Sequence, residues 1–386
     1  MTTAGDQNTE QDRLLIDAVE RFLEREVRPH VRALEAADEY PRELADRLGE
    51  LGLYGATIAP QYGGLGLSAT VYTRIVERIA AVWMSLCGLF NSHLIAAAAI
   101  ERFGTEEQKR RLLPRLASGS LRTGIALTEP GCGTDLQAVR VRATRAGAHY
   151  VVNGTKMWIT NSVEGNALAV LVKTDPSASP PHRGMSLLIV EREAGFRARK
   201  LKKLGYRGID TGEVTFEHVR VPAENLVGGV EGQGLKQILA GLELGRINVA
   251  ARGVGIARAS LEEALAYAQQ RETFGKPIAE HQAIQLKLAD MATRVEAARL
   301  LVESAARAYD TGARCDMEAG MAKLYATEAA VENSIEAMRI LGAYGYSPEF
   351  NIERYYRDAP LLAIGEGTNE MQRIIIARQL VKRHPA

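Results

Sequence analysis

The sequence predicts an α+β protein in which helices come first, a compact antiparallel β unit follows, and helices return up to the end of the chain. In both flanking regions apolar residues recur every three or four positions, as expected for helices with one buried face. Between about residues 121 and 222 they form strand-like runs instead. Neither a strand–helix–strand alternation nor a Gly-x-Gly-x-x-Gly turn occurs, which argues against a Rossmann nucleotide fold.

The first part of the chain predicts a flexible tail over residues 1–10 and a helical domain over residues 11–120. Leu15, Val19, Phe22 and Leu23 lie on one face of a segment that ends near Pro29. The pattern returns in residues 43–53 and 71–103. We expect no apolar stretch to approach the roughly 18 residues needed to cross a bilayer.

Residues 121–232 predict the β domain. Its strand-like runs include residues 150–152, 167–172 and 185–190, which are rich in Val, Leu and Ile. Asn153-Gly154 separates two such runs, and this dipeptide predicts a hairpin turn at that point.

Residues 233–386 predict a domain of long helices. In one of them, spacings of four and three alternate, as in a seam where one helix packs lengthwise against others; the seam residues are Ile284, Leu288, Met291, Val295, Ala298 and Val302. Four such helices would form a bundle.

Composition excludes several function classes. The 48 Lys and Arg nearly balance the 47 Asp and Glu, for a formal charge of +1, which disfavours binding to nucleic acid or an anionic membrane. Cys87, Cys132 and Cys315 are far apart and form no Cys-x-x-Cys pair, a pattern that suits a reducing cytoplasm. The seven histidines show no His-Glu-x-x-His spacing, so we expect no metal, and His93 is interpreted as a hydrogen-bonded core residue.

Glu366 is the candidate catalytic residue. It lies between Gly365 and Gly367, which have no Cβ atoms to keep a ligand away from the carboxylate or the neighbouring backbone N–H. These features favour a general base in a cleft. The local sequence equally fits a carboxylate at the start of a helix, over free N–H groups.

A second candidate site combines the loop at residues 126–135 with Trp158-Ile-Thr160. Two glycines and two threonine hydroxyls in the loop could surround a phosphate or the polar edge of a heterocycle, and the indole of Trp158 offers a flat face for stacking. An ordinary turn beside a core tryptophan would have the same sequence.

Six motifs in the same order make the chain resemble the acyl-CoA dehydrogenase family, most closely its short-chain-like members. The resemblance runs from about residue 12 to residue 381. The motifs are Thr128–Asp135, Asn153-Gly-Thr-Lys-Met-Trp-Ile-Thr-Asn161, Arg271-Glu-Thr-Phe-Gly-Lys-Pro277, His281-Gln282, Tyr355-Tyr-Arg-Asp358 and Gly365-Glu-Gly-Thr368. Each is weak alone, but six in register are specific.

The resemblance implies N-terminal helices, a middle antiparallel β-barrel and a C-terminal four-helix bundle, assembled as a homotetramer made of two dimers, with FAD between barrel and bundle. It implies FAD contacts within one subunit from Ile125, Leu127, Thr128, Gly133, Thr134, Trp158, Ile159, Thr160, Thr368 and Glu370. It implies contacts to a neighbour's FAD from Arg271, Thr273, Phe274, Gln282, Arg339, Leu341 and Gly342. The implied substrate contacts are Thr134, Glu243, Arg246 and Gly367.

The activity implied is α,β-dehydrogenation of an acyl-CoA to the trans-2-enoyl-CoA. Glu366 would take the α-proton, hydride would pass to flavin N5, and electrons would go on to electron-transferring flavoprotein. Some family members carry the base on an earlier helix, at the position that matches Gly245, which has no side chain to act. Glu366 is then the candidate that remains.

Several alternatives stay open. Glu243 and Arg246 could form a simple i,i+3 helix pair. Arg339, which replaces the family's usual Gln, could bind pyrophosphate or make a surface salt bridge. The acyl group could ride on a carrier protein, and the same scaffold could serve an oxidase or a flavin monooxygenase. DNA binding, known for relatives with an added basic domain, is disfavoured by the near-neutral charge.

Overall fold

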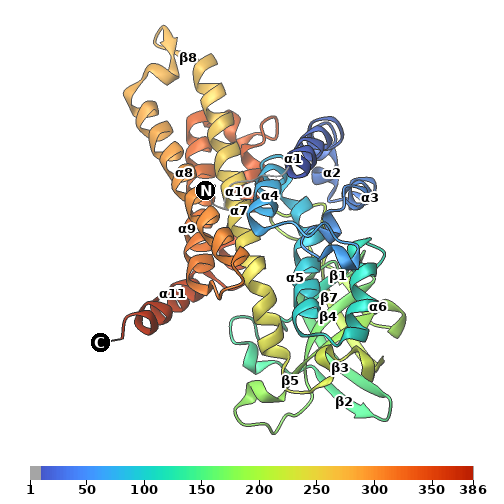
Figure 1. The fold of residues 1–386 in the computed structure, drawn as a ribbon. Helices are drawn as coiled ribbons and strands as arrows, with labels where there is room; N and C mark the ends of the chain where they lie inside the picture. The colour runs from blue at the N-terminus through green and yellow to red at the C-terminus, as the bar shows by residue number, and fades with distance from the viewer. Residues whose placement is uncertain (1–9, 386) are drawn as a thin grey trace.

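The computed structural model describes residues 10–385 and has helices at both ends of the chain around a central β region (Figure 1). The tail expected at residues 1–10 lies outside the described residues, apart from Glu10, which begins the first helix. In Figure 1 the N-terminal helices and the sheet lie on one side of the molecule, and the long C-terminal helices stand beside them.

From residue 10 on, the N-terminal region forms six α-helices: α1 (Glu10–Phe22), α2 (Val31–Ala37), α3 (Arg42–Glu50), α4 (Ala69–Trp83), α5 (Cys87–Phe103) and α6 (Glu106–Ala117). Ser68 caps α4, and Thr105 forms a capping box with Gln108 at the start of α6. The apolar face expected on the first helix is present, with Val19 and Phe22 buried.

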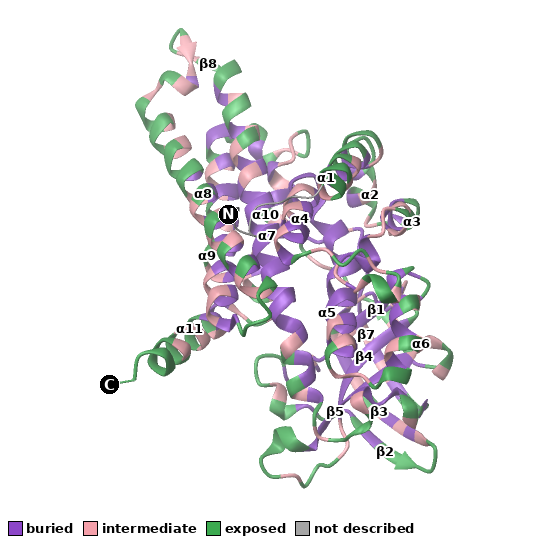
Figure 2. Ribbon diagram, viewed as in Figure 1, coloured by how far each residue is buried: buried purple, intermediate pink, exposed green. Residues whose placement is uncertain are grey.

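The expectation that no apolar stretch reaches bilayer length was wrong. Helix α4, a short 3₁₀ turn and α5 run on from Ala69 to Phe103, and an 18-residue window in this stretch has a mean hydropathy of 1.5. That window is wholly buried inside the protein, and Figure 2 shows α5 in the interior beside the sheet. Length and composition alone do not separate a core helix from a membrane span.

The middle region contains one seven-stranded sheet: β1 (Thr123–Ala126), β2 (Arg142–Ala146), β3 (His149–Thr160), β4 (Ala167–Lys173), β5 (Met185–Glu191), β6 (Arg197–Lys200) and β7 (Thr211–Pro222). The strand order is β1-β4-β2-β3-β7-β6, and β5 pairs with β4. β4 and β5 are almost completely buried.

The implied closed antiparallel barrel is corrected to an open sheet that curls into a half-barrel. β1 and β6 stand at opposite ends of the strand path and do not pair, and β1 runs parallel to β4. The edge strand β6 has only four residues, and Arg197, Arg199 and Lys200 are among them. Short, charged edges resist further strand pairing.

The hairpin expected at Asn153-Gly154 was also wrong. β3 runs straight through this dipeptide and pairs with β7 on both sides of it, with a register shift between Val152 and Gly154. Gly154 has φ +132° and lies close to Val141, so it forms a β-bulge. The real turn is Gly147-Ala148, between the paired residues Ala146 and His149, with Gly147 at φ +63°.

The C-terminal region contains α7 (Gly234–Gln270), α8 (Gln282–Asp310), α9 (Asp316–Leu341), α10 (Ile352–Ile364) and α11 (Asn369–Arg383). A two-strand hairpin of β8 (Glu272–Thr273) and β9 (Lys276–Pro277) joins α7 to α8. Helices α7 to α10 pack together, and α11, which projects from the body of the molecule in Figure 1, packs against α9. The predicted seam of α8 is confirmed, since Met291, Val295, Ala298 and Val302 are buried.

Candidate active site

Glu366 lies in the turn that joins α10 to α11. Helix α10 ends at Ile364 with Gly365 as its C-cap, and α11 begins after Thr368, whose hydroxyl accepts a hydrogen bond from the N–H of Met371. Glu366 has φ +55°, a left-handed conformation that is costly for a residue with a Cβ. Gly367, at φ +88°, continues the turn, so Glu366 is neither in a helix nor at its first position.

The carboxylate of Glu366 points inward between α5 and α7. Its Oε1 accepts a hydrogen bond from Asn91 Nδ2 on α5. Its Oε2 is shielded from solvent and has no hydrogen-bond partner among residues 10–385. A Cβ added at Gly245 of α7 would lie 2.3 Å from Oε2, so the missing side chain at that position is what leaves room for the carboxylate.

Burial raises the pKa of the Glu366 carboxyl above its ordinary value. Arg252, the hydrogen bond from Asn91, Lys323 and Arg246 act in the opposite direction, and desolvation is larger than each of them. The result is a carboxylate that holds a proton more readily than an exposed one. Such a group suits general-base chemistry near neutral pH.

Lys323 of α9 holds the Glu366 turn in place. The residue is fully buried, and its Nζ donates to the Ala363 and Gly367 carbonyls at 3.2 and 2.8 Å and to Asn369 Oδ1 at 3.0 Å. Desolvation lowers the pKa of Lys323 to about 8. Gln372 Nε2 adds a second donor to the Gly367 carbonyl, at 2.9 Å.

The loop after β1 is anchored by a buried ion pair. Lys156 of β3 is fully buried, and its Nζ donates to Glu129 Oε1 at 2.8 Å and to the Leu127 carbonyl at 2.9 Å. The carboxylate of Glu129 also accepts the N–H groups of Arg140 and Val141. The pair therefore fixes both ends of the segment that contains the predicted flavin loop.

The predicted flavin-loop residues lie at the ends of β1 and β3. Ile125 is on β1, with Leu127 and Thr128 just after it, and Gly133 and Thr134 are exposed further along the loop. Ile159 and Thr160 end β3, and Ile159 is buried. Trp158 has φ +64° and leaves 56% of its surface exposed, unusual for so large an aromatic residue. Gly131 has open space where a Cβ would be, and a Cβ at Gly133 would meet only Thr128 Cγ2, at 3.9 Å.

Helix α5 connects this loop region to Glu366. Asn161, the residue after β3, donates through Nδ2 to the Leu89 carbonyl of α5 at 3.0 Å. Asn91, half a turn further along the same helix, holds Glu366. The end of β3 and the Glu366 turn therefore meet on one short stretch of α5.

Glu243 and Arg246 of α7 are both buried, but they do not form the i,i+3 pair with each other. Arg246 instead contacts Asp316 of α9 at 3.4 Å, and its Nε has no partner among the described residues. Burial, with repulsion from Asp316, raises the pKa of Glu243. Gly367, Thr368 and Glu370 belong to the Glu366 turn or to the first turn of α11.

The remaining predicted cofactor residues lie at the other end of the bundle. Arg271 follows α7, about 40 Å along the helix axis from Gly245 at 1.5 Å per residue. Phe274, in the β8–β9 turn, is 97% exposed. The same end of the bundle contains β8, the start of α8 and the end of α9. These elements contain the other predicted residues of the group: Thr273, Gln282, Arg339, Leu341 and Gly342. The side chain of Arg339 bonds to Glu336. One chain does not bring this group to Glu366.

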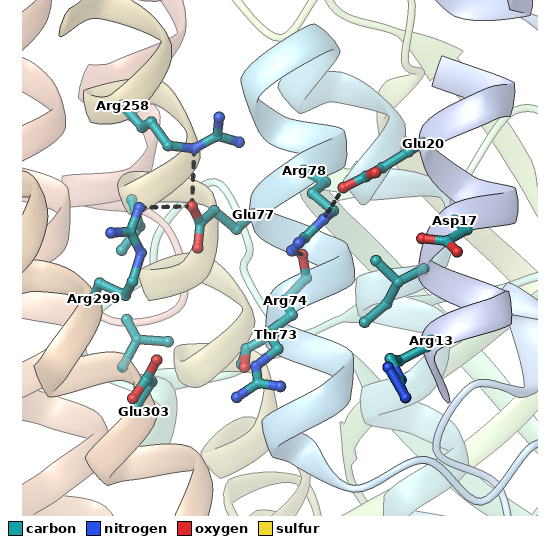
Figure 3. Close-up of a pocket in the computed structure, with 13 residues that line it drawn as sticks. Arg13, Asp17, Glu20, Thr73, Arg74, Glu77, Arg78, Arg258, Arg299 and Glu303 are labelled. Atoms are coloured by element: carbon teal, nitrogen blue, oxygen red, sulfur yellow. Dashed lines mark hydrogen bonds and ion pairs between the residues drawn. The ribbon is translucent and has the colours of Figure 1, made fainter. Parts of the chain in front are cut away.

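A hollow of about 600 Å³ between α1, α4, α7 and α8 is a separate feature (Figure 3). Its charged groups are largely paired: Glu77 with Arg258 at 2.9 Å and Arg299 at 3.2 Å, and Glu20 with Arg78 at 2.5 Å. Arg258 lies about 20 Å along α7 from Gly245. The hollow is not part of the Glu366 site.

Sequence reasoning missed four residues around these sites: Asn91, Lys156, Arg252 and Lys323. Each lies on a regular helix or strand, and each has at least one partner far away in the sequence, for example 275 residues between Asn91 and Glu366 and 165 between Arg252 and Cys87. Polar residues within apolar stretches of helix were the available signal. The interpretation of His93 is confirmed: its Nε2 lies 3.1 Å from two backbone carbonyls, and burial lowers its pKa to about 4.

Known proteins match the chain along almost its whole length. The family models for the acyl-CoA dehydrogenase N-terminal, middle and C-terminal domains match residues 9–120, 124–219 and 232–381. An acyl-CoA dehydrogenase of Bacillus subtilis is 40% identical over 376 residues, which cover 97% of this chain and 98% of that protein.

Solved structures also match the chain along almost its whole length. Butyryl-CoA dehydrogenase from Megasphaera elsdenii matches with a TM-score of 0.93 at 36% identity, over 97% of this chain and 99% of that one. A chain in the structure of the electron transferring flavoprotein of Acidaminococcus fermentans matches with a TM-score of 0.94 at 37% identity, over 99% and 100%. The protein described here therefore belongs to the acyl-CoA dehydrogenase family of flavin-dependent oxidoreductases.

Proposed function

We propose that this protein oxidises an acyl-CoA thioester to the trans-2-enoyl-CoA and that Glu366 is the base that removes the α-proton. The observation that carries the proposal is the state of the Glu366 carboxylate. One oxygen is fixed by Asn91, the other has no partner among the described residues, and the missing side chain of Gly245 provides the space that this second oxygen occupies. A buried acceptor with one free oxygen is what proton abstraction from carbon requires.

The turn also offers a way to stabilise the enolate that forms as the proton leaves. Within residues 10–385 the backbone N–H of Glu366 donates no hydrogen bond. Gly367 carries no side chain to cover it, so a thioester carbonyl could accept from this group. A donor already fixed at the site of developing charge lowers the barrier without reorganisation. Lys323 contributes indirectly, because it holds the carbonyls of the same turn.

The residues present fit FAD. The indole of Trp158 is exposed near the end of β3, and Gly131 and Gly133, in the loop after β1, leave room beside the loop backbone. Trp158, Thr128 and Thr134 would hold the ring system, and Thr368 and Glu370 would lie beside it. FAD, when bound, supplies the acceptor for the hydride that leaves the β-carbon.

We also propose a homotetramer in which subunits share the cofactor. Arg271, Phe274 and Gln282 are exposed at the far end of the bundle, about 40 Å from the Glu366 region along α7. In this arrangement they would contact the FAD of a neighbouring subunit, which accounts for the exposure of Phe274. The single chain would then lack part of the site.

The electron acceptor proposed is an electron-transferring flavoprotein. Support comes from the likeness of the whole chain to a chain in the Acidaminococcus fermentans structure. Short or branched acyl groups are the proposed substrates, in keeping with the butyryl-CoA dehydrogenase match and with isovaleryl-CoA dehydrogenases at 37% identity. The three cysteines are free and buried, and a cytoplasmic location is part of the proposal.

The test is an anaerobic visible spectrum of the purified protein before and after addition of butyryl-CoA, isovaleryl-CoA and octanoyl-CoA. Bleaching of the oxidised flavin band by one subset is the expected result, and it ranks the substrates. An intact band with every acyl-CoA would overturn the CoA substrate and direct the search to carrier-protein thioesters. Absence of flavin after reconstitution would overturn the cofactor.

Glu366→Gln tests the base. The variant should keep FAD and lose about a thousandfold in the rate of flavin reduction, because the amide cannot accept the proton. Glu349→Gln, at an exposed carboxylate, is the matched control and should reduce at the wild-type rate. Reduction of the Glu366→Gln variant at a rate near wild type would assign the base to another residue.

A further inference from the structure

Arg252 is a fully charged side chain buried next to the proposed site with no carboxylate of its own. The residue is 3% exposed, and among residues 10–385 it forms no ion pair. An arginine does not lose its proton at any pH that proteins tolerate, so the charge stays in the interior. Burying such a charge is costly unless nearby groups compensate it.

Neutral acceptors hold the guanidinium in a fixed orientation. Nε donates to Asn248 Oδ1 at 2.7 Å, Nη2 donates to the Cys87 carbonyl at 3.1 Å, and Nη1 lies 3.5 Å from the Tyr206 hydroxyl. Asn248 is itself fixed, since its Nδ2 donates to the Tyr72 hydroxyl at 2.6 Å. These bonds satisfy the geometry of the guanidinium, but none of them supplies a negative charge.

Two helices, α7 and α5, place Arg252 close to Glu366. On α7 it lies two turns after Gly245, on the same helix face, and side chains on a helix lean back toward its N-terminus. The Glu366 carboxylate lies against Gly245, in the space that a side chain there would fill. On α5, the Cys87 carbonyl that binds Arg252 lies one turn before Asn91, which binds Glu366. Both helices therefore bring the guanidinium beneath the carboxylate.

We propose that Arg252 is the buried counter-charge of Glu366, a positioning residue that stabilises the ionised carboxylate from beneath the site. The inference rests on the proposed function of Glu366 as the base. It extends that function, because it identifies which cation in this chain determines the pH at which the base becomes available.

Other groups face Glu366 from every element packed around it. Tyr72 of α4 and Tyr206, in the segment between β6 and β7, are buried phenols whose raised pKa keeps them neutral, and Cys87 is a buried thiol with its pKa raised to about 12. Arg246 of α7 is paired with Asp316. Lys323 of α9 is bound to carbonyls, with its pKa lowered to about 8.

Among the described residues near Glu366, Arg252 is therefore the permanent cation whose charge no carboxylate already neutralises. It is also the strongest of the charged groups that lower the pKa of Glu366 against the effect of burial. Removing its charge should raise that pKa. Glu366 would then become ionised only at higher pH.

The experiment follows the protonation of Glu366 in two ways, with Arg252→Gln as the main variant. One readout is the acidic limb of the pH profile of kcat/KM for flavin reduction. The other is an infrared titration of the carboxyl band, taken as the difference between each protein and its Glu366→Gln counterpart. The infrared readout needs no turnover, so it still reports on Arg252 if the proposed reaction fails.

Three further variants separate charge from structure. Arg252→Lys keeps the positive charge. Asn248→Asp keeps the guanidinium but places a carboxylate against its Nε, which neutralises it in place and remains informative if Arg252→Gln does not fold. Arg258→Gln is the matched control on the same helix, because Glu77 and Glu262 already pair with Arg258.

In both readouts, Arg252→Gln and Asn248→Asp should move the midpoint upward by about one pH unit or more, a tenfold change in the ionisation constant. Arg252→Lys and Arg258→Gln should leave it in place. Unchanged midpoints in both neutralised variants would overturn the proposal, even if their rates fall at every pH. An equal shift in Arg252→Lys would also overturn it, because the effect would then follow the shape of the side chain.

Discussion

The two ends of the C-terminal bundle contain predicted site residues of opposite character. At the Glu366 end, Asn91, Gly245 and Lys323 are buried and contact the turn directly. At the hairpin end, Phe274 is 97% exposed, and the guanidinium of Arg271 makes no hydrogen bond or ion pair within residues 10–385. Figure 2 shows the hairpin as half-buried to exposed and the outer face of α8 as largely exposed, while α7 is buried along much of its length.

This difference shows which part of the site one chain builds by itself. A buried, tethered carboxylate is ready before any ligand binds, because packing and hydrogen bonds have already fixed it. Exposed side chains lose conformational freedom only when something binds them. Changes at the first end should therefore alter the geometry or stability of the folded chain. Changes at the second end should leave the folded chain unaltered and, under the proposed sharing of FAD between subunits, should affect only FAD binding.

Among changes that keep the Glu366 carboxylate itself, the largest expected effect comes from Gly245→Ala. Its new Cβ would lie 2.3 Å from Glu366 Oε2 and 2.5 Å from Ile95 Cδ1, so the ends of these two side chains must move. Displacing a catalytic group by about 1 Å can cost roughly a hundredfold in rate. We expect a loss of about that size in single-turnover flavin reduction, with thermal stability kept because alanine favours the helix.

The control for this variant is Gly320→Ala on α9, where no atom lies closer than 3.3 Å to the new Cβ. That variant should react at the wild-type rate. Full activity in Gly245→Ala would mean that the carboxylate does not use this space during the reaction.

A smaller effect is expected from Lys323→Met, which removes three hydrogen bonds to the Glu366 turn. A buried acceptor left without its donor costs about 1–3 kcal/mol. We expect about 3 kcal/mol less stability in urea denaturation, together with slower flavin reduction. Lys382→Met, on an exposed residue of α11, should change neither quantity, and an equally stable Lys323→Met protein would contradict the anchoring role.

The smallest expected effect is that of Arg271→Gln at the hairpin end. Loss of one charge-assisted hydrogen bond to a cofactor phosphate should weaken FAD binding about tenfold, measured by flavin release on dilution. Stability of the apoprotein should stay within about 0.5 kcal/mol, as for other exposed positions. Arg21→Gln, exposed on α1, is the control. If Arg271→Gln instead destabilised the apoprotein and left FAD affinity unchanged, the hairpin end would behave like the Glu366 end, and the proposed difference between them would be wrong.

Sequence patterns predicted the helices and strands well, and they failed where pairing decided the structure. Asn153-Gly154 has the composition of a hairpin turn, but β7 pairs on both sides of it, and the dipeptide forms a bulge. The sheet remains open because β6 is short and charged, a property of an edge whose neighbours the sequence does not show. The stretch from Ala69 to Phe103 looks like a membrane span until its burial is known.

The sequence alone determined the helix–sheet–helix order, the family, and Glu366 as the candidate base, because periodicity and short motifs are local properties of the chain. Only the tertiary structure decided what acts on Glu366. Asn91 is 275 residues away, Gly245 provides the space, and Arg252 and Lys323 provide the charges. Such contacts depend on how helices pack, and burial gives a single charge or hydrogen bond its strength, which no local pattern records.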